Sequence, residues 1–267
     1  MSEPITPVEL HEDIWLKRED LYRAPSGANG SKYRAAQAIL RGINPPAVVT
    51  AASVRSPQHI ITATVAAELG IPCTVVVGGT KRPLDHPSVR AAAELGAEVT
   101  VGAVGYNTYL QSYGRDIAQL TGAFQMPYGL ACPPELDPWE VFASTARQAS
   151  ALPAEVTTLV VPFGSTNTAL GILMGLPTGI AVKFVSVGNV TLESFAEQAR
   201  RLNVPYPADV EFTKVPWSYS ESRRGAIGSV KLHPTYEGKV LAHLDAEKPS
   251  WWRAENTALW VVGGPLS

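Results

Sequence analysis

A glycine- and serine-rich loop leads directly into a lysine and an alanine-rich run, SGANGSKYRAAQ, at residues 26–37. Lys32 follows Gly27 and Gly30 and lies just inside a predicted helix start. A cation there opposes the helix dipole, so helix stability does not explain it. A lysine in such a setting is suited to forming a Schiff base with a carbonyl compound. Most lysines are solvated surface charges, as we expect for Lys17.

A second loop, GSTNT at residues 164–168, lies between an apolar strand candidate and an apolar helix candidate. Backbone N–H groups of such a loop, together with the helix dipole, form an anion site suited to one phosphate. Ser165, Thr166 and Thr168 add hydroxyl donors, and Asn167 tolerates a left-handed backbone. The spacing matches neither a P-loop nor a dinucleotide fingerprint. An ordinary strand-to-helix turn is the alternative interpretation.

Two further motifs carry polar side chains. In HPTYEGK, residues 233–239, Tyr236 and Glu237 can address two parts of one ligand, although a helix start alone would also explain the carboxylate. In SVRSPQH, residues 53–59, Ser56 either caps a helix or helps to hold a substrate carboxylate. No Cys/His spacing predicts a metal site or a disulfide framework.

Strand and helix candidates alternate along most of the chain, which predicts βαβ units and a mostly parallel sheet. The strand candidates are residues 13–20, 46–53, 72–79, 97–102, 156–163 and 181–188, and residues 258–267 are expected to form a last strand and a glycine turn. The helix candidates are residues 31–42, 56–70, 86–96, 107–121, 139–150, 169–175 and 192–202. We predict a two-lobed α/β protein with open, mostly parallel sheets and helices on both faces. The smaller lobe spans residues 47–128, and residues 1–46 and 129–267 form the larger, cofactor-binding lobe.

Composition limits the function further. The chain has 267 residues, 22 Lys and Arg against 24 Asp and Glu, and a formal net charge of −2. This balance disfavours binding to nucleic acid or a membrane surface without excluding a local basic patch. No apolar stretch is long enough to span a bilayer, and the N-terminus is too polar for a signal peptide. We expect a cytoplasmic protein.

The order of the motifs WLKREDL…GANGSKYR, SVRSPQH, GSTNT, HPTYEGK and WVVGGPL resembles the fold type II, tryptophan-synthase-β-like enzymes. Within them the chain is most similar to 1-aminocyclopropane-1-carboxylate deaminase and D-cysteine desulfhydrase. The resemblance runs from about Trp15 to Gly264, and it implies pyridoxal 5′-phosphate as cofactor and a homodimer.

The resemblance also implies roles for individual residues. Catalytic roles fall to Lys32, which would form the internal aldimine and move protons, and to Tyr236 and Tyr219. The implied cofactor-binding residues are Lys32, Gly164, Ser165, Thr166, Asn167 and Glu237, and the loop pattern adds Thr168. The implied substrate-binding residues are Ser56 and Gln58, and we expect the adjacent His59 to join them. No metal is implied.

Glu237 matches the acid that keeps the pyridine nitrogen protonated, which makes the ring a strong electron sink for a carbanion or quinonoid. The expected activity is therefore that of a lyase or deaminase acting on a small amino acid. The chain departs from the family pattern at Pro57, where the family has asparagine, at His233, where it has aspartate, and at Ser31. Two alternatives follow: a substrate whose amino-acid group is carried on a peptide, sugar or modified nucleobase, or a non-catalytic cofactor-binding protein.

Overall fold

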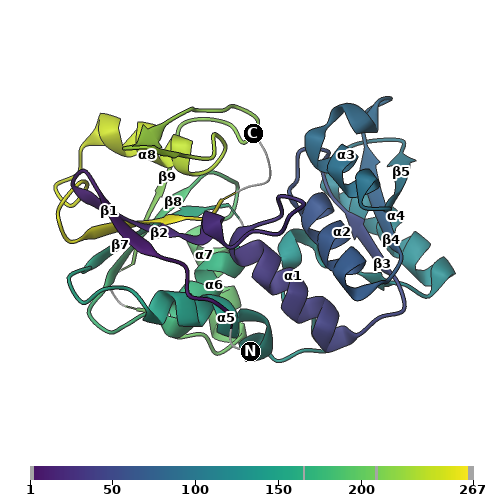
Figure 1. The fold of residues 1–267 in the computed structure, drawn as a ribbon, viewed down its shortest axis with the longest axis horizontal. Coiled ribbons are helices and arrows are strands. Elements are labelled where there is room, and N and C mark those ends of the chain that lie inside the picture. The colour runs from purple at the N-terminus through teal and green to yellow at the C-terminus, as the bar shows by residue number, and fades with distance from the viewer. Residues whose placement is uncertain (1–2, 165, 208–209, 264–267) are drawn as a thin grey trace. The chain divides into compact units, whose positions relative to one another are not determined.

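The structure is a computed structural model that describes residues 3–164, 166–207 and 210–263. The chain divides into two compact units. The first unit contains residues 3–22 and 142–263, and the second contains residues 23–141 (Figure 1). Residues 47–128, the predicted smaller lobe, lie inside the second unit, which extends beyond them on both sides. The predicted lobe boundaries stay a prediction.

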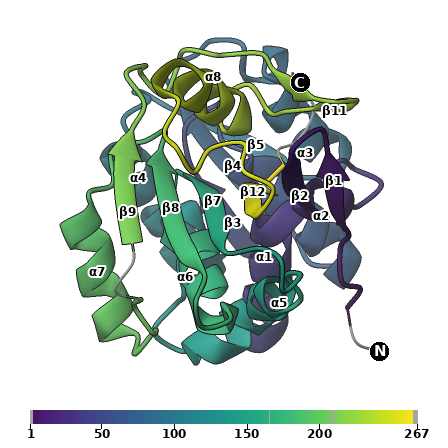
Figure 2. The same ribbon diagram turned by 90° about the vertical axis from the view of Figure 1, so that its left-hand side faces the viewer.

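The first unit is built on a six-stranded sheet. Its strands are β1 (Val8–His11), β2 (Ile14–Arg18), β7 (Thr158–Phe163), β8 (Ala181–Ser186), β9 (Val210–Lys214) and β12 (Thr257–Val261). Their order is β1-β2-β12-β7-β8-β9 (Figure 2). Only β1 runs antiparallel to its neighbour, and the other pairs are parallel. Parallel sheets are covered on both faces, which explains why the apolar run of β7 is buried throughout.

Helices cover both faces of this sheet. They are α5 (Pro138–Ser150), within which the boundary between the units falls, α6 (Thr166–Gly175), α7 (Leu192–Arg201) and α8 (Glu237–Glu247). A short hairpin, β10 (Ala226–Ile227) with β11 (Val230–Lys231), and a 3-10 turn, η1 (Glu19–Leu21), complete the unit. On one face, Val240 of α8 shares a buried apolar cluster with Val185 of β8. Phe184, the preceding residue of β8, points to the opposite face and packs against Phe195 of α7.

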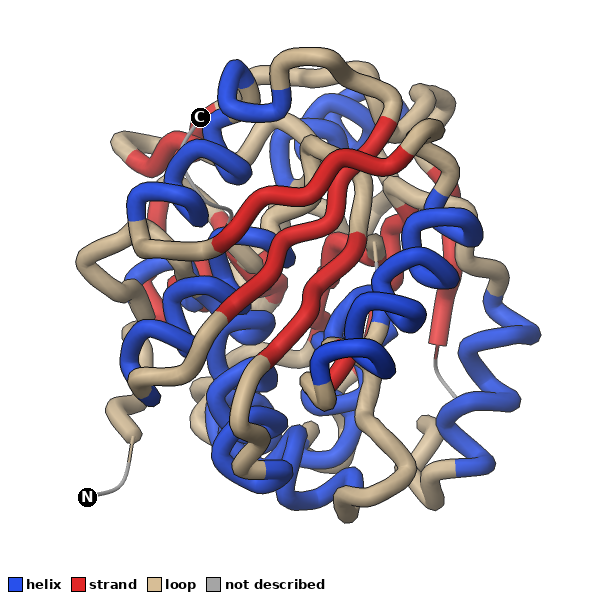
Figure 3. Tube along the Cα trace, turned by 90° about the vertical axis from the view of Figure 1, so that its right-hand side faces the viewer, coloured by secondary structure: helices blue, strands red, loops and turns tan. Residues whose placement is uncertain are grey.

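The second unit has a four-stranded sheet with helices on both sides (Figure 3). Its elements are α1 (Gly30–Ile43), β3 (Val48–Ala51), α2 (Gln58–Leu69), β4 (Cys73–Gly78), η2 (Pro83–Asp85), α3 (Pro87–Glu94), β5 (Glu98–Gly102), α4 (Asn107–Thr121), β6 (Phe124–Gln125) and η3 (Tyr128–Leu130). All strand pairs are parallel, in the order β5-β4-β3-β6. Gly114 lets α4 approach β3 closely, because a Cβ there would lie 2.9 Å from the Cβ of Ala51.

The predicted fold class is therefore confirmed: both sheets are mostly parallel and helices cover them. The sequence pattern did not predict β1, β9 or the β10–β11 hairpin. It also did not extend the helix start near Glu237 into α8. Within the described residues, no helix combines the length and apolarity that crossing a bilayer requires.

The expectation that Lys17 is a solvated surface charge is wrong. Lys17 lies on β2 and is fully buried. Its ammonium group donates to the carbonyl of Thr6 at 2.6 Å and to the Oε1 of Gln148 at 2.9 Å. These partners are 11 and 131 positions away in the chain. Because a buried charge needs hydrogen-bonding partners, Lys17 serves to join β2 to α5 and to the N-terminal segment.

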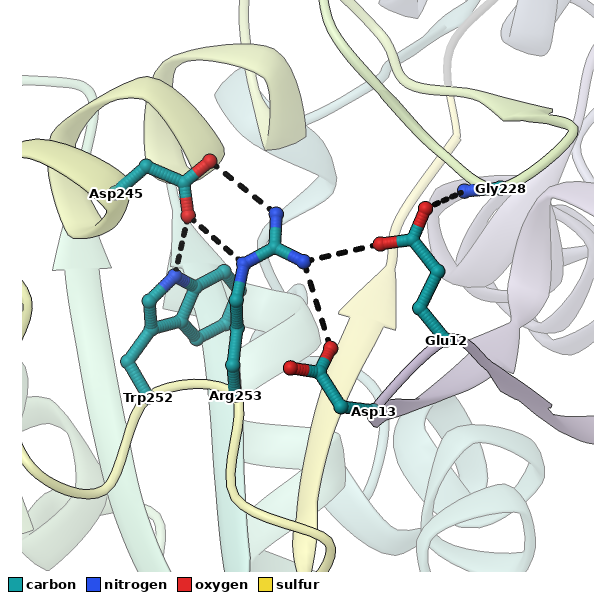
Figure 4. Close-up of polar contacts among 6 residues, drawn as sticks. All are labelled: Glu12, Asp13, Gly228, Asp245, Trp252 and Arg253. Atoms are coloured by element: carbon teal, nitrogen blue, oxygen red, sulfur yellow. Dashed lines mark hydrogen bonds and ion pairs between the residues drawn. The ribbon is translucent and has the colours of Figure 1, made fainter.

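Arg253 joins three segments of the first unit (Figure 4). Its guanidinium donates to both carboxylate oxygens of Asp245, with Nε 3.0 Å from Oδ1 and Nη2 3.3 Å from Oδ2. Its Nη1 also lies 3.1 Å from Glu12 and 3.4 Å from Asp13, in the turn between β1 and β2. Trp252 donates to Asp245 Oδ1 at 2.7 Å. The network holds the end of α8 and the chain before β12 against that turn.

We expect Arg253→Gln to lower the free energy of unfolding by about 1–2 kcal/mol at neutral pH, since it removes bidentate, charge-assisted hydrogen bonds from a partly exposed site. Burial opposes ionisation of Asp245, but hydrogen bonds from Arg253 and Trp252 outweigh it and hold the pKa of this carboxyl below its ordinary value. The stabilisation is therefore present above the ordinary carboxyl pKa and is lost as the pH falls through the depressed one.

Urea unfolding at neutral and at acidic pH measures this difference. Arg147→Gln is the control, because Arg147 lies 3.9 Å from Glu3 at an exposed position and such pairs contribute little. Equal losses for the two variants, or a loss at Arg253 that persists in acid, would contradict the interpretation of Figure 4.

Candidate active site

Three glycines of the first unit follow neighbouring strands at the carboxyl edge of the sheet. Gly164 comes directly after β7, Gly188 lies two residues after β8, and Gly263 lies two residues after β12. Open α/β sheets bind ligands at this edge. A Cβ on Gly188 would lie 3.1 Å from the carbonyl oxygen of Gly164, so the two loops approach closely because side chains are absent there.

Helix α6 begins at Thr166, directly behind this edge. The first N–H groups of a helix have no partner within the helix and carry partial positive charge, which suits a phosphate. Asn167 and Thr168 are buried in the first turn of this helix, so Asn167 has helical backbone there. The predicted phosphate contact at Ser165 lies outside the described residues. The phosphate role of the loop stays a prediction.

Tyr236 forms the neighbouring wall. A Cβ on Gly164 would lie 2.9 Å from the Cε1 of Tyr236, so the tyrosine ring occupies the space beside the loop. Tyr219 reaches this ring from a different segment: the two hydroxyl oxygens are 2.9 Å apart, and the rings meet edge to face with centroids 6.3 Å apart. Tyr236 is 6% exposed, whereas Tyr219 is 42% exposed. The structure thus brings together the two tyrosines that the resemblance singled out.

Glu237 is the first residue of α8 and is fully buried. Its Oε1 accepts a hydrogen bond from the N–H of Gly263 at 3.1 Å. Its Oε2 is buried and has no hydrogen-bond partner among the residues that the structure describes. Burial raises the pKa of this carboxyl to about 8, although backbone N–H groups of Glu237, Gly263 and Val262 act in the opposite direction. A buried carboxyl oxygen of this kind requires either a proton or a donor other than those of residues 3–164, 166–207 and 210–263.

Lys32 belongs to the second unit, where it is the third residue of α1 and half-buried. The loop before it depends on glycine, because Gly27 and Gly30 adopt positive φ angles of 94° and 72°. Asn29 occupies the N-cap position of this helix.

The three predicted substrate-binding residues lie at the start of α2. The hydroxyl of Ser56 accepts from the N–H of Gln58 at 3.2 Å. The side-chain amide of Gln58 is 2% exposed, and it donates to Thr50 and accepts from the N–H of Gly129. His59 is fully buried, and its Nε2 lies 2.9 Å from the carbonyl oxygen of Ser53. Burial lowers the pKa of His59 to about 4. The contacts of Gln58 and His59 lie inside the unit, and their role toward a substrate stays a prediction.

Sequence reasoning passed over Gly188, Gly238 and Lys239. The last two belong to the HPTYEGK motif, from which only Tyr236 and Glu237 were selected. A signal for Lys239 was present, since a lysine at the start of a helix opposes the dipole and so invites another explanation.

A family model described as "Pyridoxal-phosphate dependent enzyme" matches residues 4–220. The chain belongs to this family. Its cofactor is pyridoxal 5′-phosphate.

One curated relative, the "O-seryl-dTMP PLP-dependent decarboxylase" of Salmonella phage ViI, is 25% identical, and the alignment covers 96% of this chain and 79% of the relative. Among solved structures, an ACC deaminase homologue is similar with a TM-score of 0.77 and 21% identity, over 98% of this chain and 91% of that one. Maize serine racemase is similar with a TM-score of 0.67 and 16% identity, over 99% and 89%. These structures show that the fold is shared.

Two features of the first unit fit the cofactor. The start of α6 offers N–H groups to a phosphate. The buried Oε2 of Glu237 offers an acceptor that a protonated pyridine nitrogen would satisfy. The paired charge would also bring the pKa of Glu237 back toward its ordinary value.

The raised pKa of Glu237 predicts a pH-dependent stability for the cofactor-free protein. The folded chain holds a proton that the unfolded chain releases above the ordinary carboxyl pKa. The stability contributed is fully present below that ordinary value and is lost as the pH rises through about 8. We expect the free energy of unfolding to fall across this window, and Glu237→Gln to remove most of the fall. Chemical unfolding of both cofactor-free proteins at several pH values measures it, and parallel pH curves would contradict the assignment.

Proposed function

We propose that this enzyme removes the carboxylate, as CO2, from an amino-acid group carried on a nucleotide. The observation that carries the proposal is that residues 56–58, where the family resemblance expects the substrate carboxylate, have no N–H group left to donate to it. The N–H of Ser56 donates to the carbonyl of Ser53 at 2.8 Å, Pro57 has no N–H, and the N–H of Gln58 donates to the Ser56 hydroxyl.

This shortage favours loss of the carboxylate for an energetic reason. Hydrogen bonds to a carboxylate stabilise its negative charge, which disappears as CO2 forms. A carboxylate site with many N–H donors would therefore stabilise the ground state more than the transition state and raise the barrier. A site with few donors does not raise the barrier in this way. The similarity to a relative whose name states that it decarboxylates O-seryl-dTMP supports both the reaction and the nucleotide carrier.

The proposed roles of the chain's own residues follow. Bound pyridoxal phosphate supplies the electron sink for negative charge at the α-carbon. The start of α6 would hold its phosphate, Glu237 would keep its ring nitrogen protonated, and Lys32 would hold the cofactor covalently until the amine of the substrate takes its place. As CO2 leaves, the bonding electron pair stays on the α-carbon, and the released Lys32 amine would donate a proton there. Tyr236, with Tyr219, relays protons at the wall beside Gly164.

The direct test uses the protein loaded with its cofactor and O-seryl-dTMP, with release of CO2 and formation of the amine as readouts. CO2 release supports the proposal. Ammonia or keto-acid release from small D- or L-amino acids, with none of the nucleotide consumed, would instead establish the second candidate, a lyase or deaminase. Glu237 favours that candidate too, because a protonated ring assists either reaction. Bound cofactor with no turnover of any substrate would exclude both and indicate a non-catalytic protein.

Adding one N–H donor at the start of α2 tests whether the scarcity of donors there speeds the loss of CO2. Pro57→Ala restores an N–H at the helix start. If this group reaches the carboxylate, it stabilises the ground state selectively, and we expect CO2 release to slow by about tenfold, the value of one hydrogen bond to a charged group. Pro87→Ala, at the first position of α3, is the matched control and should leave the rate unchanged. A Pro57→Ala enzyme that releases CO2 as fast as the wild type would contradict the proposal that few N–H donors at residues 56–58 favour this reaction.

A further inference from the structure

Lys239 is a fully buried cation that the proposed reaction does not use. It is the third residue of α8, where a positive charge opposes the helix dipole. Its ammonium group donates to the backbone carbonyls of Ser218 and Tyr219, at 2.8 and 3.2 Å, and lies 5.6 Å from the centre of the Tyr219 ring. The partners of Lys239 therefore lie in one stretch of backbone, about 20 residues earlier in the chain.

The glycine before Lys239 brings the same stretch close to α8. A Cβ on Gly238 would lie 2.0 Å from the carbonyl oxygen of Arg223, a distance that no side chain tolerates. Residues 218–223 are thus fixed to the start of α8 at two points: by the Lys239 hydrogen bonds at one end and by the close approach at Gly238 at the other.

This attachment determines where the Tyr219 hydroxyl lies. The Tyr219 side chain is 42% exposed, so burial alone does not fix it. The backbone that carries it is held by Lys239, and the hydroxyl then lies 2.9 Å from that of Tyr236, whose ring packs beside Gly164. The YEGK motif accordingly contributes Tyr236 itself and, through the hydrogen bonds of Lys239, fixes the backbone of Tyr219.

We propose that Lys239 is a positioning residue, which holds residues 218–219 so that the Tyr219 hydroxyl stays hydrogen-bonded to Tyr236 at the active site. The catalytic consequence rests on the proposed function, because it assumes that the tyrosine pair takes part in the reaction. The positioning itself depends only on the contacts of the first unit.

A double-mutant cycle tests the catalytic part in the cofactor-loaded enzyme. Lys239→Met keeps the length of the side chain and removes its donors, and Tyr219→Phe removes the hydroxyl. If Lys239 acts through Tyr219, each single variant and the double variant should lower kcat on O-seryl-dTMP by the same factor, about fivefold for one lost hydrogen bond. Independent effects that multiply in the double variant would overturn the proposal.

Hydrogen exchange tests the positioning without any substrate. We expect Lys239→Met to accelerate amide exchange in residues 218–223 by at least about tenfold while β7 keeps its protection, and Tyr219→Phe to leave both unchanged. Lys183→Met is the control, since Lys183 is also a nearly buried lysine, paired with Glu211 and lying over a Trp251 ring. Lys239→Gln, whose side chain is shorter, replaces the methionine variant if that one does not fold.

The two readouts separate the possible failures. If no substrate is turned over but exchange at residues 218–223 responds to Lys239, the proposed function fails and the positioning role stands. If turnover is normal in Lys239→Met and exchange is unchanged, the positioning role is wrong and the proposed function stands.

Discussion

Replacing Lys32 with alanine is expected to remove both the visible absorbance of the purified protein and its activity. The family resemblance assigns Lys32 the covalent bond to the cofactor, and the glycines before it, both at positive φ, shape a loop that a routine helix start does not need. Loss of the amine removes the covalent attachment and the proton donor together. Since positioned acid–base groups alone contribute about 10²- to 10⁴-fold, we expect activity to fall by at least this much.

The measurement is an absorbance spectrum before and after borohydride treatment, together with turnover of O-seryl-dTMP. Wild-type protein should lose its visible band on reduction, and Lys32→Ala should lack the band from the start. Lys81→Ala, an exposed lysine of the same unit, serves as control and should behave as the wild type. A borohydride-sensitive band that survives in Lys32→Ala would move the attachment to another lysine.

Glu237→Gln is expected to reduce activity on the order of 10²-fold, the usual cost of losing one buried electrostatic contact in an active site. The carboxyl group is buried with one oxygen unpartnered among the described residues, so it can pass its proton to the ring nitrogen and pair with the charge that forms there. An amide has no charge to hold that proton, and the ring becomes a weaker electron sink.

The same substitution is expected to stabilise the cofactor-free protein above pH 8 or so, because it removes a carboxylate whose ionisation burial disfavours. Activity and stability thus change in opposite directions, as is common for residues of active sites. Turnover and chemical unfolding of the wild type and of Glu237→Gln, measured in the same buffers, test both expected changes. A Glu237→Gln enzyme that retains full activity would show that the ring nitrogen does not depend on this residue.

Local patterns in the sequence were sufficient for the fold class. Apolar runs such as TLVVPF mark strands buried on both faces, and glycines after helical stretches mark their ends, so the alternation of strands and helices predicts parallel sheets. The helix at residues 107–121 was predicted with the bounds that the structure gives it. The family and the cofactor were predicted from the order of the motifs, through their resemblance to known enzymes, and the family model agrees.

The tertiary structure alone decided what surrounds the functional side chains. The residues next to Lys17 in the chain do not indicate that it is buried, because one of its hydrogen-bond acceptors, Gln148, lies 131 positions away in the sequence. The hydroxyls of Tyr219 and Tyr236 meet although the residues are 17 positions apart in the chain. Lys239 finds its hydrogen-bond acceptors about 20 residues upstream. Periodicity and composition report which residues prefer to be buried. Which distant segments cover them, and hence which charges lie buried and paired, depends on packing across the whole unit.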